Sequence, residues 1–383
     1  MKHLILITFS ISLLILNAQI SDCDCQGRYL NEIFNSVDVT TVTYSETYNL
    51  EMDVYTPLGD FCQNRPLLVF AHGGAFVGGS KNNSLAESIC ESFAKRGYVA
   101  ASINYRLATH NTVLGNDPFS VFGLTWFYDL ENGIKVLYSA FSDVKAAIRY
   151  FRKDFTENGN TFSIDNNQIW FGGNSAGSAL GPHLAYINSV EEFIQGVDVS
   201  GQDYVQEITT QNGGIEGNSG NEGYSSEISG LINLAGAIHN LDWIAPTDNI
   251  PIVSCHGTND STVPENCGSI ISPGALTVCG SIAMEPVLTE NNIINELLVF
   301  PGEGHTPWSP NSQNYFDVMD FIVPFVFNNL NCSSVDVIEN NVQHKSKFKI
   351  DIFGRDFNDN KSGLFFEFHL DGSVSKKYLI ENY

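Results

Sequence analysis

The chain has 383 residues, of which 43% are hydrophobic, and it includes 26 Phe and 15 Tyr. This composition favours a globular chain with a large core and argues against disorder. The formal net charge of -24 disfavours binding to nucleic acid or to an anionic membrane surface, because both attract Lys and Arg. We expect one large domain with terminal appendages.

Residues 1–19 have the pattern of a signal peptide. Lys2 and His3 precede an apolar run over 4–16, and small residues follow up to Gln19. The run is too short to span a bilayer. We therefore expect cleavage near Gln19 and a secreted or cell-surface protein. Since no later stretch is apolar for long enough, we expect no stable membrane insertion.

Eight cysteines fit this exported context, because disulfides persist outside the cytoplasm. Cys267 and Cys279 bracket a short loop and are the best candidates for a pair. We expect one or two further bridges in the N-terminal region, which contains Cys23, Cys25 and Cys62. Cys90 and Cys255 can equally be buried free thiols.

Before the main array, residues 39–47 and 50–55 alternate like antiparallel edge strands. From residue 67, short apolar runs alternate with amphipathic helical stretches, which predicts a mainly parallel sheet flanked by helices. The predicted strands are 67–71, 99–104, 168–171, 230–237, 251–255 and 296–300. The predicted helices are 85–96, 142–153 and 315–328. We assign this α/β domain to residues 20–331.

Two insertions interrupt the array. Residues 108–138 are rich in aromatic side chains, whereas residues 202–226 are rich in Gly, Asn and Ser. Either can be a cap over a site or a surface decoration. An exposed aromatic patch usually has a use, which favours a lid for the first.

Residues 332–383 predict a separate small β-module. The runs 348–355 and 364–370 alternate, and a turn separates the second from Lys376-Lys377. These motifs resemble the C-terminal sorting domains of the type IX secretion system. The resemblance implies secretion machinery as a partner. The alternative is an ordinary β-hairpin appendage.

The strongest chemical signal is Gly173-Asn174-Ser175-Ala176-Gly177, which lies between a predicted strand and a helical run. A sharp strand-to-helix turn needs glycines on both sides of a nucleophile whose backbone is strained. We predict Ser175 as the nucleophile. The N–H of Ala176, at the helix start, can face a developing oxyanion.

The segment His72-Gly73-Gly74-Ala75-Phe76 follows the first strong core strand, where an oxyanion loop belongs. Positions without side chains let backbone N–H groups approach a substrate oxygen, so we predict Gly73 and Gly74 as donors. His72 is expected to brace the loop. The predicted substrate pocket includes aromatic side chains of this loop and of the first insertion, namely Phe76, Trp126 and Phe127.

A carboxylate and an imidazole follow in the order acid, then base. Asp260 lies in the polar loop after the strand that ends at 255, and His305 lies in the Gly-rich loop after the strand that ends at 300. All three groups then lie at the carboxyl ends of strands, where open α/β sheets build sites. His305 would remove the Ser175 proton, and Asp260 would hold the imidazole tautomer.

Other side chains compete for the roles of base and acid. The rival bases are His256, His239 and His183, and the rival acids are Asp248 and Glu265. His256 lies too early in its loop, and the other two histidines follow no strand and glycine pattern. Only Asp260 lies at the expected position of the acid.

On these motifs, and on Asn104-Tyr105-Arg106-Leu107, the chain resembles carboxylesterases and hormone-sensitive-lipase-like esterases of the α/β-hydrolase superfamily over residues 52–329. The resemblance implies an α/β-hydrolase fold and hydrolysis of a small-molecule or polymeric ester. Asn174 and Ala75 depart from the usual pattern. The alternatives are a peptidase of the same fold and a non-catalytic binding or adhesion module. We expect no cofactor and no metal, because no such motif occurs.

Overall fold

The computed structural model describes Cys25, residues 27–108, 130–197, 199–270 and 277–331, and three strands after residue 345. The chain divides into two compact units, Met1–Cys332 and Ser333–Tyr383. The predicted signal peptide over 1–19 lies outside the described residues, as do Trp126 and Phe127.

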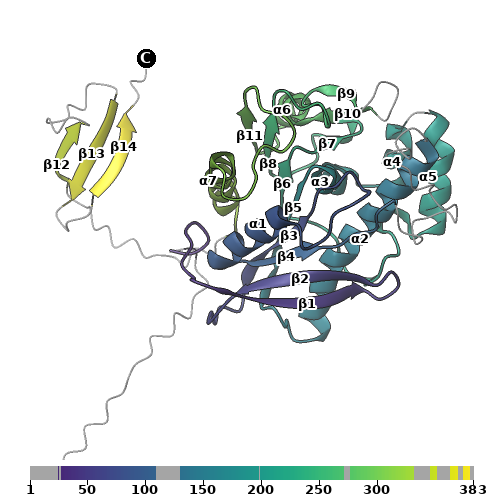
Figure 1. The fold of residues 1–383 in the computed structure, drawn as a ribbon, viewed down its shortest axis with the longest axis horizontal. Helices are drawn as coiled ribbons and strands as arrows, with labels where there is room; N and C mark the ends of the chain where they lie inside the picture. Colours follow the sequence, from purple (N-terminus) through teal and green to yellow (C-terminus); the bar gives the residue numbers. More distant parts are fainter. Residues whose placement is uncertain are drawn as a thin grey trace, which may run out of the picture. The chain divides into compact units, whose positions relative to one another are not determined.

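The first unit is built on an eight-stranded sheet. Its strands are β1 (Val37–Ser45), β2 (Leu50–Pro57), β3 (Arg65–Ala71), β4 (Val99–Ile103), β5 (Ile164–Asn174), β6 (Gly230–Leu234), β8 (Ile252–Gly257) and β11 (Asn295–Phe300). They lie in the order β1-β2-β4-β3-β5-β6-β8-β11 (Figure 1). The pairs β1–β2 and β2–β4 are antiparallel, and all other neighbours in this sheet run parallel. The prediction of a mostly parallel central sheet is therefore confirmed. Since parallel strands end at one edge, the loops after β3, β5, β8 and β11 can meet there.

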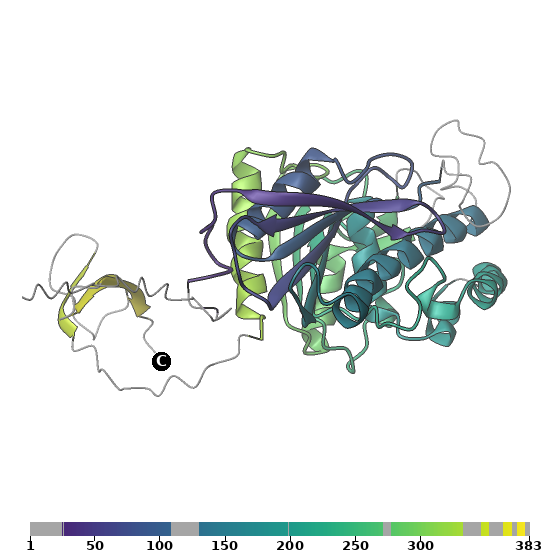
Figure 2. The same cartoon turned by 90° about the horizontal axis from the view of Figure 1, so that it is seen from below.

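Helices cover both faces of this sheet (Figure 2). They are α1 (Ser84–Lys95), α2 (Leu130–Glu157), α3 (Ala176–Tyr186), α4 (Val190–Gly196), α5 (Val199–Gln211), α6 (Ser281–Glu290) and α7 (Gln313–Asn328). Alternate residues of β3 face opposite ways: Leu67 belongs to the core that includes α2 and α3, and Leu68 to the core that includes α1 and α7. A strand buried on both faces reads as a continuous apolar run, which is why β3 is easy to find in the sequence.

Both predicted insertions contain more regular structure than their composition indicated. The helix expected over 142–153 begins at Leu130, so residues 130–138 belong to α2 and not to an insertion. The apolar stripe continues through Ile134, Leu137 and Phe141 at helical spacing. Likewise, α5 and a 3-10 turn, η2 (Gly214–Glu216), occupy much of 202–226.

A second sheet in this unit has the order β7 (Ala237–Ile238), β10 (Thr277–Gly280), β9 (Cys267–Ser269). The disulfide predicted between Cys267 and Cys279 is confirmed, and it joins β9 to β10. Cys25 and Cys62 each take part in a disulfide as well. Cys90 and Cys255 are buried free thiols, and burial raises the pKa of both.

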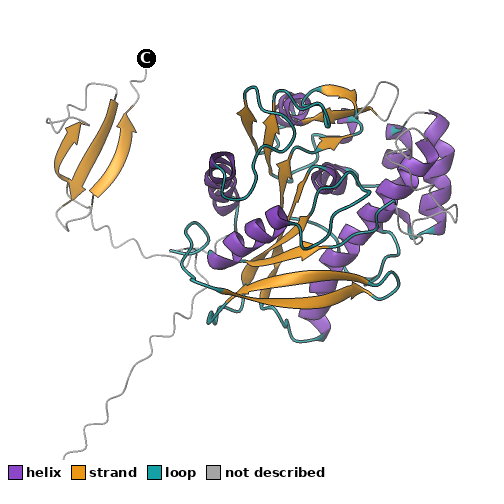
Figure 3. Ribbon diagram, viewed as in Figure 1, coloured by secondary structure: helices purple, strands orange, loops and turns teal. Residues whose placement is uncertain are grey.

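The second unit contains an antiparallel sheet of β12 (Ser346–Asp351), β13 (Gly363–His369) and β14 (Val374–Leu379) (Figure 3). The first two strands coincide with the alternating runs of the tail, and β14 carries Lys376 and Lys377. Among the described residues of both units, no helix is both long and apolar enough to cross a bilayer.

Candidate active site

Ser175 lies on a strained turn between β5 and α3. Its backbone φ of 54° falls in a region that residues other than glycine rarely adopt. The turn is held because the Ser175 N–H donates to Leu234 O at 2.8 Å. A Cβ at Gly173 would approach Gly177 C to 2.4 Å, and one at Gly177 would approach Ala71 O to 2.3 Å. Both glycines are therefore required, because the turn packs on itself and on the end of β3.

Three side chains from distant loops form one line of hydrogen bonds. Ser175 Oγ lies 2.7 Å from His305 Nε2, and His305 Nδ1 lies 2.6 Å from Asp260 Oδ2. The carboxylate accepts the Nδ1 proton, which leaves Nε2 as the acceptor of the serine hydroxyl. The Asp260 side chain is fully buried, whereas 21% of the His305 side chain is exposed. An imidazole in this position can take up the hydroxyl proton and still reach a substrate.

The loops that carry Asp260 and His305 are bound to each other through their backbones. Thr258 N–H donates to Phe300 O at 3.1 Å, and Asn259 N–H donates to Glu303 O at 2.8 Å. Gly302 N–H donates to Thr258 Oγ1 at 2.7 Å. The spacing between Asp260 and His305 is thus fixed by main-chain contacts as well as by their own hydrogen bond.

Asp260 is held as a carboxylate. Its Oδ1 accepts hydrogen bonds from the backbone N–H groups of Thr262 and Val263, each at 2.9 Å. Burial raises the pKa of Asp260, but hydrogen bonds from His256, His305 and the Val263 N–H outweigh burial and hold this pKa well below its ordinary value. The group therefore remains a charged acceptor for the His305 ring at neutral pH.

A second buried histidine, His256, supports Asp260 from the other side. Its Nε2–H points to two acceptors, Val263 O at 3.1 Å and Asp260 Oδ2 at 3.4 Å, of which Val263 O is closer. Its Nδ1 accepts from Ser281 Oγ at 2.9 Å, and Ser281 Oγ accepts from Asn233 Nδ2 at 3.1 Å. Sequence reasoning missed this network, because its members come from three elements and become neighbours only in the fold.

The rival bases and acids make other contacts. His183 donates from Nδ1 to Ala179 O at 2.6 Å, and His239 donates from Nδ1 to Thr277 O at 2.9 Å. Asp248 accepts from Ala245 N–H at 2.7 Å. Within the described part of the chain, none of these side chains, nor His256 or Glu265, is hydrogen-bonded to Ser175, whose Oγ contacts His305.

The predicted oxyanion donors lie near the nucleophile. A Cβ at Gly73 would be 3.2 Å from Ser175 Cβ, so the backbone at Gly73 lies directly against it. Gly74 forms a tight turn, in which its carbonyl accepts from Val77 N–H at 3.0 Å. Among the described residues, the N–H groups of Gly73, Gly74 and Ala176 have no hydrogen-bond acceptor. A developing oxyanion next to Ser175 would be in reach of donors at Gly73 and Ala176.

His72 braces the loop that carries Gly73 and Gly74, the predicted oxyanion donors. Its ring stacks on Tyr105 with 4.4 Å between ring centroids, and its Nδ1–H donates to Gly73 O at 2.6 Å. The Tyr105 hydroxyl donates to His72 O at 2.8 Å. The loop is therefore held by the segment that follows β4, to which Tyr105 belongs.

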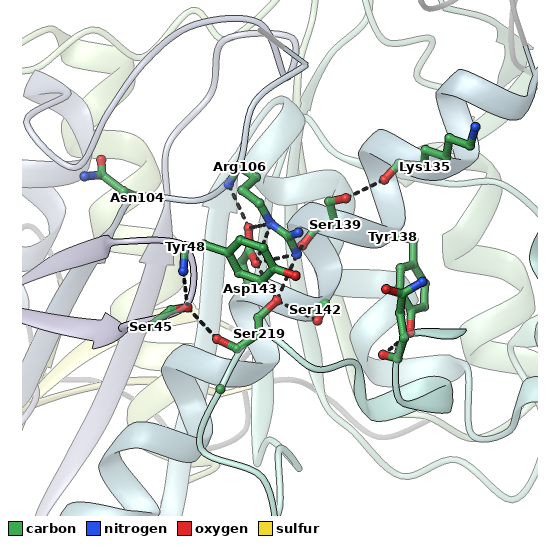
Figure 4. Close-up of polar contacts among 12 residues, drawn as sticks. Ser45, Tyr48, Asn104, Arg106, Lys135, Tyr138, Ser139, Ser142, Asp143 and Ser219 are labelled. Carbon is green, nitrogen blue, oxygen red and sulfur yellow. Dashed lines mark hydrogen bonds and ion pairs between the residues drawn. The ribbon is translucent and has the colours of Figure 1, made fainter. Parts of the chain in front are cut away.

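That segment is fixed by a buried ion pair (Figure 4). Arg106 Nη2 lies 2.8 Å from Asp143 Oδ1, and both side chains are almost fully buried. The guanidinium lies 3.7 Å from the centre of the Tyr48 ring. Ser219 donates to Asp143 Oδ1 at 2.6 Å and accepts from Arg106 Nη2 at 2.9 Å. The pair thus joins the β1–β2 hairpin, α2 and the loop after η2, and it supports Tyr105 next in the chain.

Replacing Asp143 by alanine should lower the free energy of unfolding by about 3–5 kcal/mol, because Arg106 would remain buried without its counter-charge. Denaturant unfolding measures this loss. The double variant Arg106→Met/Asp143→Leu removes both charges and should recover a large part of it. A loss below about 1 kcal/mol in Asp143→Ala would contradict the importance given to this pair.

Asn174, which departs from the usual motif, also has a contact that explains it. Its Oδ1 accepts from the indole N–H of Trp308 at 2.9 Å. Trp308 lies three residues after His305, so the side chain next to Ser175 contacts the segment that carries His305. An acidic residue is not needed for this bond, because an amide oxygen also accepts a hydrogen bond.

A cavity of about 50 Å³ opens next to Ser175. Its walls include Phe76, Ala176 and Val263. The other two residues predicted for the pocket, Trp126 and Phe127, lie outside the described residues.

Comparisons with known proteins agree with this architecture. A family model described as BD-FAE matches residues 52–115. Two solved structures of esterase 2 from Thermogutta terrifontis, one phosphorylated by paraoxon and one with propionate bound, are each 18% identical to this chain with a TM-score of 0.52. The alignments cover 77% of this chain and 95% and 94% of those chains. A butyrate-bound structure of that esterase is 17% identical, with a TM-score of 0.52, and the alignment covers 78% and 96% of the two chains.

No curated protein matches the sequence. The structural likeness therefore bears on architecture. The strand order, the turn at Ser175 and these alignments agree that the first unit has the α/β-hydrolase fold.

Proposed function

We propose that the protein is a serine carboxylic-ester hydrolase that works through an acyl-enzyme. Ser175 is the nucleophile, His305 the base and Asp260 its partner. The observation that carries the proposal is the unbroken line from Ser175 Oγ to His305 Nε2 at 2.7 Å and from His305 Nδ1 to Asp260 Oδ2 at 2.6 Å. A serine hydroxyl attacks an ester only when a base removes its proton during the attack, and this geometry supplies that base.

The reaction has two halves. In the first, Ser175 Oγ bonds to the ester carbonyl carbon while its proton moves to His305 Nε2, and the carbonyl oxygen becomes an oxyanion. The N–H groups of Ala176 and Gly73 stabilise that oxyanion, and each such donor typically contributes about 10²–10³ in kcat. The C–O bond then breaks, and His305 gives its proton to the departing alkoxide. Water repeats the sequence on the acyl-enzyme and restores Ser175.

The solved structures support an ester as the class of substrate, but they do not identify a particular ester. The esterase that they represent binds propionate and butyrate and is phosphorylated by paraoxon. Paraoxon phosphorylates an activated serine, so we propose the same chemistry at Ser175. The binding module and the peptidase have no observation of their own in their favour.

Paraoxon tests the proposal directly. The intact mass of the purified protein should increase by one diethylphosphoryl group, and peptide mapping should assign this group to the peptide that contains Ser175. The variant Ser175→Ala should stay unmodified. A wild-type chain that remains unmodified and hydrolyses no ester would favour the binding module, whereas cleavage of peptides but not of esters would favour the peptidase.

A further inference from the structure

A second cavity adjoins the one at Ser175. It lies among α2, α3, α4 and the 3-10 turn η3 (Leu241–Trp243), and its volume is about 50 Å³. Leu137, His183 and His239 line both cavities. We call the second cavity the apolar chamber. A group that extends from Ser175 past these three side chains enters it.

The described walls of the chamber are apolar because their polar atoms are already bonded to the protein. The indole N–H of Trp243 donates to Glu192 O at 3.0 Å, and the Tyr138 hydroxyl donates to Gly214 O at 2.6 Å. Apart from His183 and His239, the remaining described walls are aliphatic or aromatic, for example Leu180, Phe193 and Ile215. A polar occupant would lose its hydration without finding partners here.

His183, at the junction of the two cavities, is neutral. Its Nδ1–H donates to Ala179 O at 2.6 Å, and its Nε2 accepts from the backbone N–H of His239 at 3.3 Å. Both ring nitrogens are thereby used in the uncharged form. Burial agrees with this, since it lowers the pKa of His183 to about 4. His183 therefore offers no charge to a carboxylate or an ammonium group.

We propose that the apolar chamber holds the acyl chain of the substrate, and that the protein prefers esters of acids with longer acyl chains over acetates. This proposal rests on the proposed function. The alkoxide that leaves must accept a proton from His305, and His305 lines neither cavity. The part of the ester that reaches the chamber is therefore the acyl part. Each buried methylene contributes about fourfold to kcat/KM.

The experiment compares p-nitrophenyl acetate, butyrate, hexanoate and octanoate, which share one leaving group. In the wild type, kcat/KM should rise by about fourfold per methylene until the chamber is filled. Ile215→Trp fills the chamber from a half-buried wall position and should lower the hexanoate-to-acetate ratio at least tenfold, with acetate changed less than about threefold. The matched control is Ile294→Trp, because Ile294 is 58% exposed and lines neither cavity. It should leave the ratio unchanged.

A second variant covers the case in which Ile215→Trp does not fold. Phe193→Leu enlarges the chamber and should raise the octanoate-to-hexanoate ratio by about the value of one methylene, fourfold. A flat chain-length profile in the wild type, or equal losses on acetate and hexanoate in Ile215→Trp, would overturn the proposal. The proposal would also be overturned if Ile215→Trp changed kcat/KM only when the alcohol of an acetate ester is varied, and not when the acyl chain is varied. If none of the four esters is hydrolysed, the proposed function itself fails; if they are hydrolysed with a flat profile, only the chamber assignment fails.

Discussion

Replacing Ser175 by alanine should lower kcat for p-nitrophenyl butyrate by a factor on the order of 10⁵ to 10⁶. The hydroxyl that lies 2.7 Å from His305 Nε2 would be absent, so no acyl-enzyme can form. Substrate binding and the backbone donors at Gly73 and Ala176 would remain, and KM should change little. Steady-state kinetics with active-site titration of the wild type measures both values.

Two controls separate this loss from a loss of fold. Thermal unfolding of Ser175→Ala should stay cooperative, because the hydroxyl has no other hydrogen bond among the described residues. Ser312→Ala makes the same substitution at the N-cap of α7, where Ser312 Oγ accepts the Tyr315 N–H. It should cost about 1 kcal/mol of stability and leave kcat intact. If Ser175→Ala kept more than about a hundredth of the wild-type kcat, another residue would have to be the nucleophile.

Local patterns made much of the fold and of the site predictable. The strands β3, β8 and β11 are short apolar runs, and each ends in a loop with distinctive residues. The glycines around Ser175 predict a sharp turn, and the structure explains them because the turn leaves no room for a Cβ at Gly173 or Gly177. Once the sheet is recognised as parallel, the loops must gather at one edge. Chain order, together with the place of each residue in its loop, then predicts that Ser175, Asp260 and His305 lie close together.

The remaining features depend on contacts between distant segments, which no local pattern encodes. Ser219 contacts Asp143 across 76 residues, so the loop after η2 looked like a decoration in the sequence while it completes a buried ion pair. His256 looked like a misplaced base because it lies on β8 itself. Its partner Ser281 is the first residue of α6, a helix that the sequence pattern did not reveal. A histidine four residues before the predicted acid was the one available signal.

Replacing Asp260 by asparagine should lower kcat by about 10⁴, and the surroundings of this residue explain why so small a change is so costly. Oδ1 accepts two backbone N–H groups, from Thr262 and Val263. An amide NH₂ cannot take that place, because it would face two donors. The asparagine must therefore keep its oxygen there and turn its NH₂ toward His305 Nδ1.

This orientation imposes the wrong tautomer on the base. An NH₂ group next to His305 Nδ1 makes that nitrogen an acceptor, so the ring proton moves to Nε2, which lies 2.7 Å from Ser175 Oγ. Nε2 then has no lone pair to receive the serine proton. The effect should appear in kcat, with little change in KM, since Asp260 does not line the Ser175 cavity.

The rival acids provide matched controls for this variant. Asp248→Asn and Glu265→Gln make the same kind of substitution at carboxylates that are not hydrogen-bonded to His305 within the described residues, and both should keep kcat within about threefold of the wild type. Paraoxon should still label Ser175 in these two variants at the wild-type rate, but far more slowly in Asp260→Asn, because labelling needs the same proton transfer. If Asp260→Asn kept more than a tenth of kcat while either control lost it, the acid would have to be reassigned, and the low pKa of Asp260 would reflect the packing of its loop rather than the activation of His305.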